Sequence, residues 1–325
     1  MSVTPLRLAV ELERERVSRP PSRWDYAADR GFHALARAGV WLVLVLLGLI
    51  LWEIGGKGSR AIGDYGLRFL TSTTWDVGRA QFGILPHIWG TLYSSLLALI
   101  IGGFFGVAMA IFLTQDFLPP KLAVVFRTVV ELLAAIPSVV YGLWGLFVVV
   151  PAVRPMAAWL YDHAGWVPWF GSTLSGPGLA PAALVLAIMV LPTVAAISQD
   201  ALRLVPYRVK EAAYGMGTTR WEAILKVMLP TAATGIFGAL VLGFGRALGE
   251  TMALAMLIGN SNQISLSLFS PANTLAALLA LNFPEAGTRE VEVLMYAALV
   301  LLAITLVVNV AGELIMLVSA RKAKA

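Results

Sequence analysis

The sequence predicts an all-α membrane protein with six transmembrane helices. Its composition, six long apolar stretches and the uneven spread of its basic residues all point to this fold class. Hydrophobic residues make up 58% of the 325-residue chain and charged residues 13%, and the mean hydropathy is +0.80. Soluble domains have roughly 45–50% apolar and about 25% charged residues, so lipid is the natural solvent for this chain.

Six stretches are apolar over the length of about 20 residues that a membrane-spanning helix needs. They lie at about 38–54, 88–113, 122–150, 178–197, 231–258 and 293–318. The outer connections at 55–87 and 151–177 contain Trp75, Trp159, Trp166 and Trp169, and tryptophan favours the boundary between membrane and water. We expect short interfacial helices there, with plain loops as the alternative, and an outer helix or a partial re-entry within 260–292.

The basic residues predict the orientation of these helices. Most of the 24 Lys and Arg residues lie in the N-terminal segment, the second and fourth connections and the tail. The other connections hold only Lys57, Arg60, Arg68, Arg79, Arg154 and Arg289. Because basic residues collect on the cytoplasmic side, both termini are expected in the cytoplasm.

The chain is expected to divide into four parts. A cytoplasmic N-terminal segment covers 1–37, and the first transmembrane helix with its external loop covers 38–83. The main transmembrane domain covers 84–319, with a cytoplasmic loop at 199–230, and a cytoplasmic tail covers 320–325.

Several functional classes are excluded by what the sequence lacks. It has no cysteine, and His33, His87 and His163 share no ligand spacing, so neither a disulfide nor a metal site is expected. No Gly-x-Ser-x-Gly or phosphate-binding Gly-x-x-x-x-Gly-Lys-Ser/Thr pattern occurs, so we expect no enzyme and no cofactor in this chain. The basic pI of about 9.6 follows from topology and does not indicate nucleic acid.

The fifth apolar stretch contains two ionisable residues, Arg246 and Glu250. Residues four apart share one face of a helix, so the spacing predicts an ion pair. Ionisable groups within a membrane helix face the protein interior or a wet path, and the planar donors of arginine suit an oxyanion. The two interpretations are an anion path and a structural ion pair.

The third apolar stretch is interrupted by Pro137, which removes one backbone hydrogen bond from a helix. Ser138 and Tyr141 provide hydroxyl groups near this interruption, and Glu131 lies toward the cytoplasmic end. A break of this kind exposes backbone groups that must face protein or a wet cavity. These residues are therefore candidates for lining a path through the membrane.

The cytoplasmic loop at 199–230 predicts a helix, a sharp turn and a second helix that enters the membrane. Gly217 suits the turn that closes the first helix, and Pro230 suits the first turn of the second. The spacing of Glu-Ala-Ala, Gly and Leu-Pro resembles the "EAA" signature of ABC importer permeases. The resemblance assigns contact with a cytoplasmic ATPase to Glu211, Ala212, Ala213, Gly217, Trp221, Leu229 and Pro230.

The chain resembles phosphate ABC transporter permeases from about Ala38 to Leu317. The strings IPSVVYGLWGLF and GRALGETMA carry this resemblance, together with FGILPHIWGTLYSS. They favour the PstC type over the sister PstA type, which shares the EAA loop. The resemblance implies a type I ABC importer bundle of the MetI kind and a substrate path that includes Arg246, Glu250, Glu131, Ser138 and Tyr141.

The same resemblance implies partners in a bacterial inner membrane. They are a homologous PstA-type permease, two PstB-type ATPases that bind ATP and magnesium, a periplasmic or lipid-anchored PstS-type phosphate-binding protein, and membrane lipids. An ABC permease for another oxyanion such as sulfate, molybdate or phosphonate is the principal alternative. A secondary transporter would carry more helices and an internal repeat, which the sequence lacks.

Overall fold

The structure, a computed structural model, describes residues 22–115 and 117–322. The chain divides into two units, and the boundary in the sequence lies between Glu53 and Ile54. The helices of the described part are α2 (Arg23–Tyr65), α3 (Arg68–Thr71), α4 (Leu85–Thr114), α5 (Pro120–Ala135), α6 (Ser138–Trp144), α7 (Val150–Ala164), α8 (Leu179–Arg203), α9 (Tyr207–Gly215), α10 (Arg220–Glu222), α11 (Leu229–Leu248), α12 (Met252–Leu257), α13 (Leu275–Asn282) and α14 (Thr288–Lys322). Two π-helical segments, η1 (Gly145–Val149) and η3 (Ala223–Met228), and two 3₁₀ turns, η2 (Pro168–Phe170) and η4 (Phe283–Glu285), join some of them.

The described part of the first unit is the N-terminal portion of α2. This helix begins at Arg23, so it starts well before the predicted stretch 38–54, and it continues to Tyr65 in the second unit. The N-terminal turn is capped by Ser22, whose hydroxyl oxygen accepts a hydrogen bond from the Asp25 amide at 3.2 Å. The predicted helix is therefore confirmed, but its bounds were too narrow.

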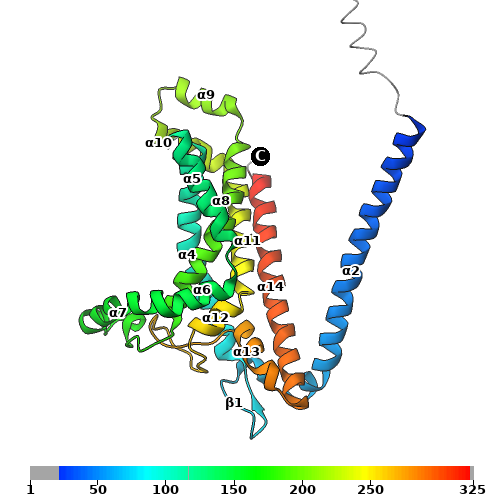
Figure 1. Ribbon diagram of the computed structural model, residues 1–325, viewed down its shortest axis with the longest axis vertical. Coiled ribbons are helices and arrows are strands. Elements are labelled where there is room, and N and C mark those ends of the chain that lie inside the picture. Colours follow the sequence, from blue (N-terminus) through cyan, green and yellow to red (C-terminus); the bar gives the residue numbers. More distant parts are fainter. Residues whose placement is uncertain (1–21, 116, 323–325) are drawn as a thin grey trace, which may run out of the picture. The chain divides into compact units, whose positions relative to one another are not determined.

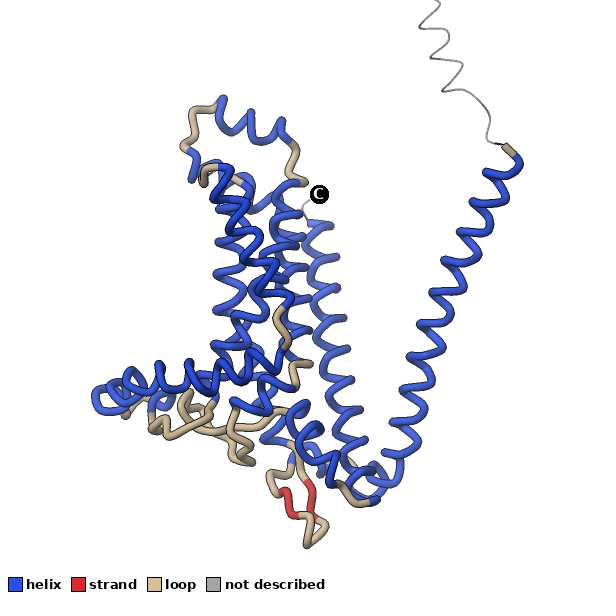
Figure 2. Tube along the Cα trace, viewed as in Figure 1, coloured by secondary structure: helices blue, strands red, loops and turns tan. Residues whose placement is uncertain are grey.

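In the second unit, α4, α5, α8, α11 and α14 run side by side, and α6 and α7 lie across one end of them (Figure 1). The same end carries α12, α13 and the strands β1 (Trp75–Asp76) and β2 (Gln81–Phe82), whereas α9 lies at the opposite end (Figure 2). The two strands pair antiparallel, with Trp75 opposite Phe82. The functional segments therefore divide between the two ends of the helical bundle.

Six described helical stretches are long and apolar enough to cross a membrane. The first, second, fourth, fifth and sixth overlap the predicted stretches in the same order along the chain. The third is Ser138–Ala164 instead of 122–150. The predicted third helix is wrong as a continuous element because α5 ends at Ala135 and Pro137 begins a new direction (Figure 1). Ile136, which precedes the proline, is extended with ψ 128°, as steric clash with the proline ring requires.

The fifth predicted stretch, 231–258, is also interrupted. A continuous helical run from Arg220 ends at Leu248, and α12 starts only at Met252. Gly249 caps the end of α11. The structure thus contains two interrupted membrane helices where the sequence predicted one.

Helices are present in two of the predicted connections. Helix α7, expected as a separate short helix, is the C-terminal part of the third apolar stretch Ser138–Ala164, and the turn η2 follows it. Helix α13 with η4 lies within 260–292, where a helix was expected. The β1–β2 hairpin was not predicted, because each strand has only two residues and no alternating pattern marks it. Phe69, Phe82 and Ile84 are buried together against α13 and α14, so this end of the bundle has a core of its own.

Helices α4 and α8 approach each other closely because small residues line their seam. A Cβ atom on Gly102 would lie 2.5 Å from the carbonyl oxygen of Ala187, and one on Gly106 would lie 2.9 Å from Cβ of Val194. Such glycines let two membrane helices pack backbone against backbone. In lipid the hydrophobic effect does not drive helices together, so van der Waals contact at such a seam stabilises the pair. This seam forms the centre of the main core.

Replacing Gly102 with alanine should destabilise the helical bundle. The added methyl group meets a backbone carbonyl that cannot move without shifting α8, so the cost is about 1–3 kcal/mol. The melting temperature of the purified chain in detergent, followed by tryptophan fluorescence, measures this loss. Gly63→Ala is the matched control, since nothing lies within 4 Å of that position; equal melting temperatures for both variants would contradict the tight seam.

Candidate functional site

The break between α5 and α6 is closed by a side chain. In an unbroken helix the carbonyl of Leu133 would accept a hydrogen bond from residue 137, but Pro137 has no N–H. The Tyr141 hydroxyl instead donates to this carbonyl oxygen at 2.8 Å, and the Tyr141 side chain is only 5% exposed. Tyr141 therefore satisfies a backbone group that an apolar environment would leave orphaned.

The break between α11 and α12 is closed in a similar way. The carboxylate of Glu250 accepts a hydrogen bond from the Ala253 amide at 3.4 Å, in the first turn of α12. The Thr251 hydroxyl donates to the carbonyl of Gly249 at 3.1 Å. A carboxylate beside the free amides of a helix N-terminus is favourable, so Glu250 stabilises the start of α12.

The predicted ion pair between Arg246 and Glu250 is wrong. The ion pairs between residues of the described ranges do not include it, and the helix that would align the two side chains ends at Leu248 between them. Arg246 instead donates from Nη1 to the Thr193 hydroxyl of α8 at 3.5 Å. Its charge also lies near the Tyr141 phenol.

Arg246 is thus the point where three elements meet. It stands two residues before the end of α11, bonds to α8 one residue after Pro192, and lies near Tyr141 of α6. Its side chain is exposed in the single chain, so its charge is free to face a path or a partner. Ser138 is half-buried at the first position of α6, and Glu131 is exposed on α5.

At the opposite end, α9 carries the Glu-Ala-Ala sequence and ends in a tight turn. Gly217 has φ +79°, its amide donates to the Tyr214 carbonyl at 2.9 Å, and the Thr218 amide donates to the Ala213 carbonyl at 3.4 Å. These two bonds form a Schellman motif, in which the left-handed position strongly favours glycine. The predicted turn at Gly217 is confirmed.

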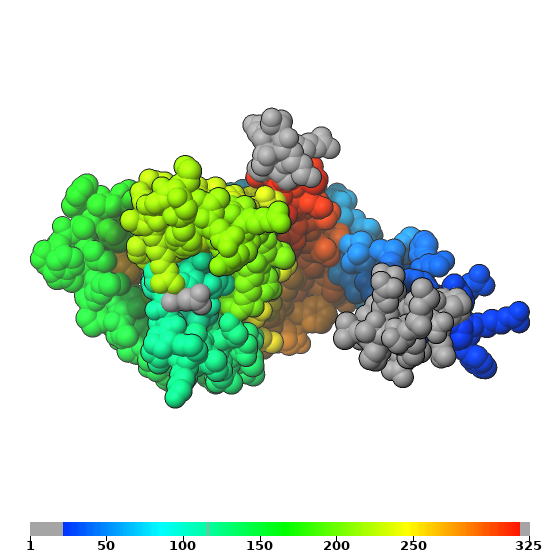
Figure 3. All heavy atoms as spheres, turned by 90° about the horizontal axis from the view of Figure 1, so that it is seen from above, coloured from blue at the N-terminus to red at the C-terminus, as the bar shows by residue number. Residues whose placement is uncertain are grey.

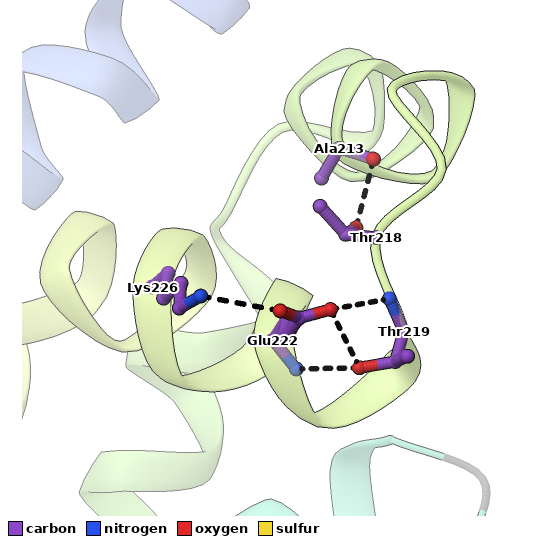
Figure 4. Close-up of polar contacts among 5 residues, drawn as sticks. All are labelled: Ala213, Thr218, Thr219, Glu222 and Lys226. Atoms are coloured by element: carbon purple, nitrogen blue, oxygen red, sulfur yellow. Dashed lines mark hydrogen bonds and ion pairs between the residues drawn. The ribbon is translucent and has the colours of Figure 1, made fainter.

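The next helix begins two residues later with a capping box (Figure 4). The Thr219 hydroxyl oxygen accepts from the Glu222 amide at 3.3 Å, and the Thr219 amide donates to the Glu222 carboxylate at 3.0 Å. Lys226 donates to the same carboxylate at 3.2 Å. This network satisfies the free amides at the helix start and leaves only Thr218 between the turn and the cap.

The residues of the Glu-Ala-Ala loop point in different directions. Glu211 and Ala212 are exposed on α9, whereas Ala213 is 7% exposed and packs into a core with residues of α4, α8 and η3. Trp221 is 48% exposed. Glu211 and Ala212 are therefore accessible to a partner, and Ala213 holds α9 against the bundle.

Pro230 lies in the first turn of α11, as predicted. Helix α11 follows the π-helical segment η3 without a break, so the helical run as a whole begins earlier, at Arg220. Leu229, just before it, is half-buried. The wider π turns ahead of Pro230 accommodate a residue that cannot donate a backbone hydrogen bond.

Several residues of these two regions were missed from the sequence. Thr193 had only a weak signal, its place after Pro192 in an apolar helix. Arg220 had a stronger one, since it follows Thr219 in a Thr-x-x-Glu capping box. Within residues 22–115 and 117–322, no group of three or more His, Cys, Asp or Glu side chains lies close enough to hold a metal ion.

Comparison with known proteins identifies the family. Residues 102–325 match the family described as binding-protein-dependent transport system inner membrane component. The phosphate transport system permease protein PstC of Mesorhizobium japonicum is 41% identical over 303 residues, which cover 90% of this chain and 91% of that protein. The PstC of Haemophilus influenzae is 41% identical over 281 residues, covering 84% and 88%. The chain belongs to the PstC family of phosphate transport permeases.

A third relative matches at lower identity. The probable phosphate transport system permease protein PstC of Methanocaldococcus jannaschii is 34% identical over 289 residues, covering 86% of this chain and 91% of that protein. Members of this binding-protein-dependent class are inner-membrane transport components and not enzymes. The chain is accordingly a multi-pass inner membrane protein and a non-catalytic subunit.

Solved structures show the same fold at low sequence identity. A chain of a bacterial alginate ABC transporter, in complex with a periplasmic protein bound to alginate pentasaccharide, matches with a TM-score of 0.62 and 17% identity, covering 89% of this chain and 94% of that one. An inward-facing MetNI methionine ABC transporter chain matches with a TM-score of 0.54 and 19% identity, covering 73% and 95%. The predicted MetI-type importer bundle is thereby confirmed.

Tyr141→Phe tests the role of its hydroxyl in closing the first helix break. The Leu133 carbonyl would lose its partner, at a cost of about 1–3 kcal/mol in the free energy of unfolding. In a Pro137→Ala background the new backbone N–H can donate to that carbonyl, so the same change should cost less. Chemical denaturation of the four proteins in detergent completes this double-mutant cycle. An equal cost in both backgrounds would refute the assignment.

Proposed function

We propose that this chain is the permease subunit that carries inorganic phosphate through the inner membrane, driven by ATPases outside the chain. Membership of the PstC family supports the substrate class. The observation that carries the mechanism is the position of Arg246, a cation at the interruption of α11 and within reach of α8 and α6.

The chemistry of Arg246 fits a tetrahedral oxyanion. Its guanidinium offers planar pairs of N–H donors, and these match two oxygens of one phosphate. A divalent anion pays a large desolvation penalty in an apolar medium, and a fixed cation beside a wet path lowers it. Because Arg246 has a neutral partner in Thr193 and no carboxylate partner among residues 22–115 and 117–322, its charge remains available to the substrate.

The other candidate residues have distinct proposed roles along this path. Tyr141 and Ser138 lie at the break between α5 and α6, where the Leu133 carbonyl has no helical backbone partner. Glu250 holds the start of α12 and thereby keeps the second break open beside Arg246. Glu131 is exposed on α5, four residues before the end of this helix.

We further infer that the chain works with a homologous permease, two ATPases that bind ATP and magnesium, and an external phosphate-binding protein. Glu211 and Ala212 on α9 are the accessible residues for ATPase contact. ATP binding would draw the ATPases together and move α9, so that the paired permeases alternate between inward and outward access. This chain itself would bind no cofactor.

The end of the bundle that carries α9 is proposed to face the cytoplasm, with both chain termini. Basic residues cluster in the α8–α11 connection, and α14 ends on the same side of the bundle as α9 (Figure 1). The positive-inside rule then assigns the β1–β2 hairpin to the outside.

Uptake of radiolabelled phosphate by starved cells tests the transport proposal. Arg246→Gln should lower the rate at least about tenfold, because a hydrogen bond to a charged group is worth roughly 1.5–3 kcal/mol. Arg30→Gln, an exposed arginine on α2, is the control and should transport normally. Normal membrane levels of the Arg246 variant exclude a folding defect. Unchanged uptake in Arg246→Gln would rule out its contact with substrate.

A different oxyanion would be revealed in the same assay. Unlabelled sulfate, molybdate and phosphonate, each in excess, should leave labelled phosphate uptake intact if phosphate is the substrate. Strong competition by one of them would make that anion the proposed substrate. Unchanged phosphate uptake in cells that lack the chain would rule out phosphate as its substrate.

Single-cysteine labelling tests the orientation, because the chain has no cysteine. Val77→Cys on the hairpin and Met216→Cys beside α9 are 53% and 86% exposed positions. In cells treated so that the reagent reaches the outer face of the inner membrane, a membrane-impermeant maleimide should label position 77 before lysis. It should label position 216 only after lysis. The reverse order would invert the topology.

A further inference from the structure

A side-chain cluster at the end of the bundle that carries α9 joins the α4–α5 connection to the start of the helix that follows α9. We propose that Arg220, held by Gln115 and Phe117, is a positioning residue that passes the movement of α9 to α4 and α5. This inference rests on the proposed ATP-driven function, since α9 must move for the contact to matter. We call Gln115, Phe117, Arg220 and Trp221 the latch.

The latch is built from three contacts that reinforce one another. The Arg220 Nη2 donates to the backbone carbonyl oxygen of Gln115, and its guanidinium carbon lies 4.3 Å from the centre of the Phe117 ring. The Phe117 ring stacks on Trp221, with centroids 5.0 Å apart and planes at 28°. One arginine thus satisfies a carbonyl and a ring face from the same connection.

The position of Arg220 has an electrostatic reason. Gln115 is the C-cap of α4, where the last carbonyls lack helical partners and the helix dipole is negative. The Gln115 residue is 6% exposed, so water reaches its carbonyl poorly. A cation at this point stabilises the end of α4, and the capping box at Thr219 holds Arg220 in the first turn that reaches it.

The connection from α9 to the latch has little slack. Gly217 and Thr218 are bonded back to α9, and Thr219 already caps the next helix. Figure 4 shows this succession from Ala213 through Thr218 and Thr219 to Glu222. A displacement of α9 is therefore transmitted directly to Arg220, one residue further along.

The connection from the latch to α5 is equally stiff. Phe117 is separated from α5 only by Leu118 and Pro119, and α5 itself begins with Pro120. Proline fixes its own backbone angle φ, so a pull on Phe117 moves α5 instead of unwinding the connection. Figure 3, seen from this end, shows the yellow-green atoms of the α9–α10 region lying directly beside the blue-green atoms of α5.

The far end of α5 explains why such transmission matters. Helix α5 stops at the break before Pro137, where Tyr141 bonds to its Leu133 carbonyl. Arg246 lies near the same tyrosine. The latch thereby provides a mechanical route from the proposed ATPase-facing helix to the break at which α5 ends, beside the proposed phosphate path.

The test measures coupling, the amount of phosphate imported per ATP hydrolysed. The complete transporter, with its partner permease, ATPases and binding protein, is reconstituted in liposomes, and uptake and hydrolysis are followed together. Arg220→Gln and Phe117→Leu should each lower the phosphate-to-ATP ratio about threefold to tenfold while hydrolysis continues. Phe117→Tyr, which keeps the ring face, should preserve the ratio, and so should Lys121→Gln, an exposed cation on α5.

The following results would overturn the proposal or the function on which it rests. An unchanged ratio in Arg220→Gln and Phe117→Leu, or uptake and hydrolysis that fall in parallel, would overturn the latch. If Arg220→Gln fails to assemble, Arg220→Lys replaces it, since the amine keeps the charge but loses the planar contact with Phe117; its ratio must then fall. If the wild-type transporter imports no phosphate, the proposed function fails, independently of the latch variants.

Discussion

The constraint on which the structure depends is that backbone hydrogen bonds cannot be left open inside a membrane. Uninterrupted helices meet it automatically, but this chain interrupts two of them, before Pro137 and at Gly249–Thr251. Each interruption is repaired by a polar side chain: Tyr141 supplies a donor to the Leu133 carbonyl, and Glu250 supplies an acceptor for the Ala253 amide. The breaks are therefore stable features, because each has a polar side chain that bonds to an open backbone group.

The proposed function depends on the charge of Arg246, which the second break leaves without a carboxylate partner in its own helix. Since Glu250 is engaged with α12, the charge of Arg246 is not neutralised within its own helix, and its hydroxyl partner Thr193 orients it without cancelling it. A cation in this state suits an anion that must leave again, because a permanently paired arginine would have to break an ion pair in each transport cycle. The tight seam of α4 and α8 packs these two helices backbone against backbone.

The sequence predictions were correct where a few consecutive residues determine the feature, and wrong where distant parts of the chain determine it. The turn at Gly217 was correct because a left-handed residue after an alanine-rich helix is a property of a few consecutive residues. The pair of Arg246 and Glu250 was wrong because the spacing argument assumed an unbroken helix, and Gly249 ends it. The kink at Pro137 was expected, yet the new direction of α6 and α7 was not, since a proline removes a bond without specifying the angle that replaces it. Ala213 was expected to face a partner but is buried, because helix burial depends on neighbours supplied by α4, α8 and η3.

Apolar composition and the spread of basic residues determined by themselves that the chain enters a membrane as a set of helices, because transfer into lipid depends on the summed hydrophobicity of each stretch. The short motifs around Glu211 and Arg246 likewise indicated the transporter family. Only the tertiary structure decided which polar groups meet: Tyr141 with Leu133, Arg246 with Thr193, and Arg220 with Gln115 and Phe117. The last two of these contacts join residues from 53 to 105 positions apart, and which groups meet over such distances is determined by how whole helices pack, a cooperative property that no local pattern encodes.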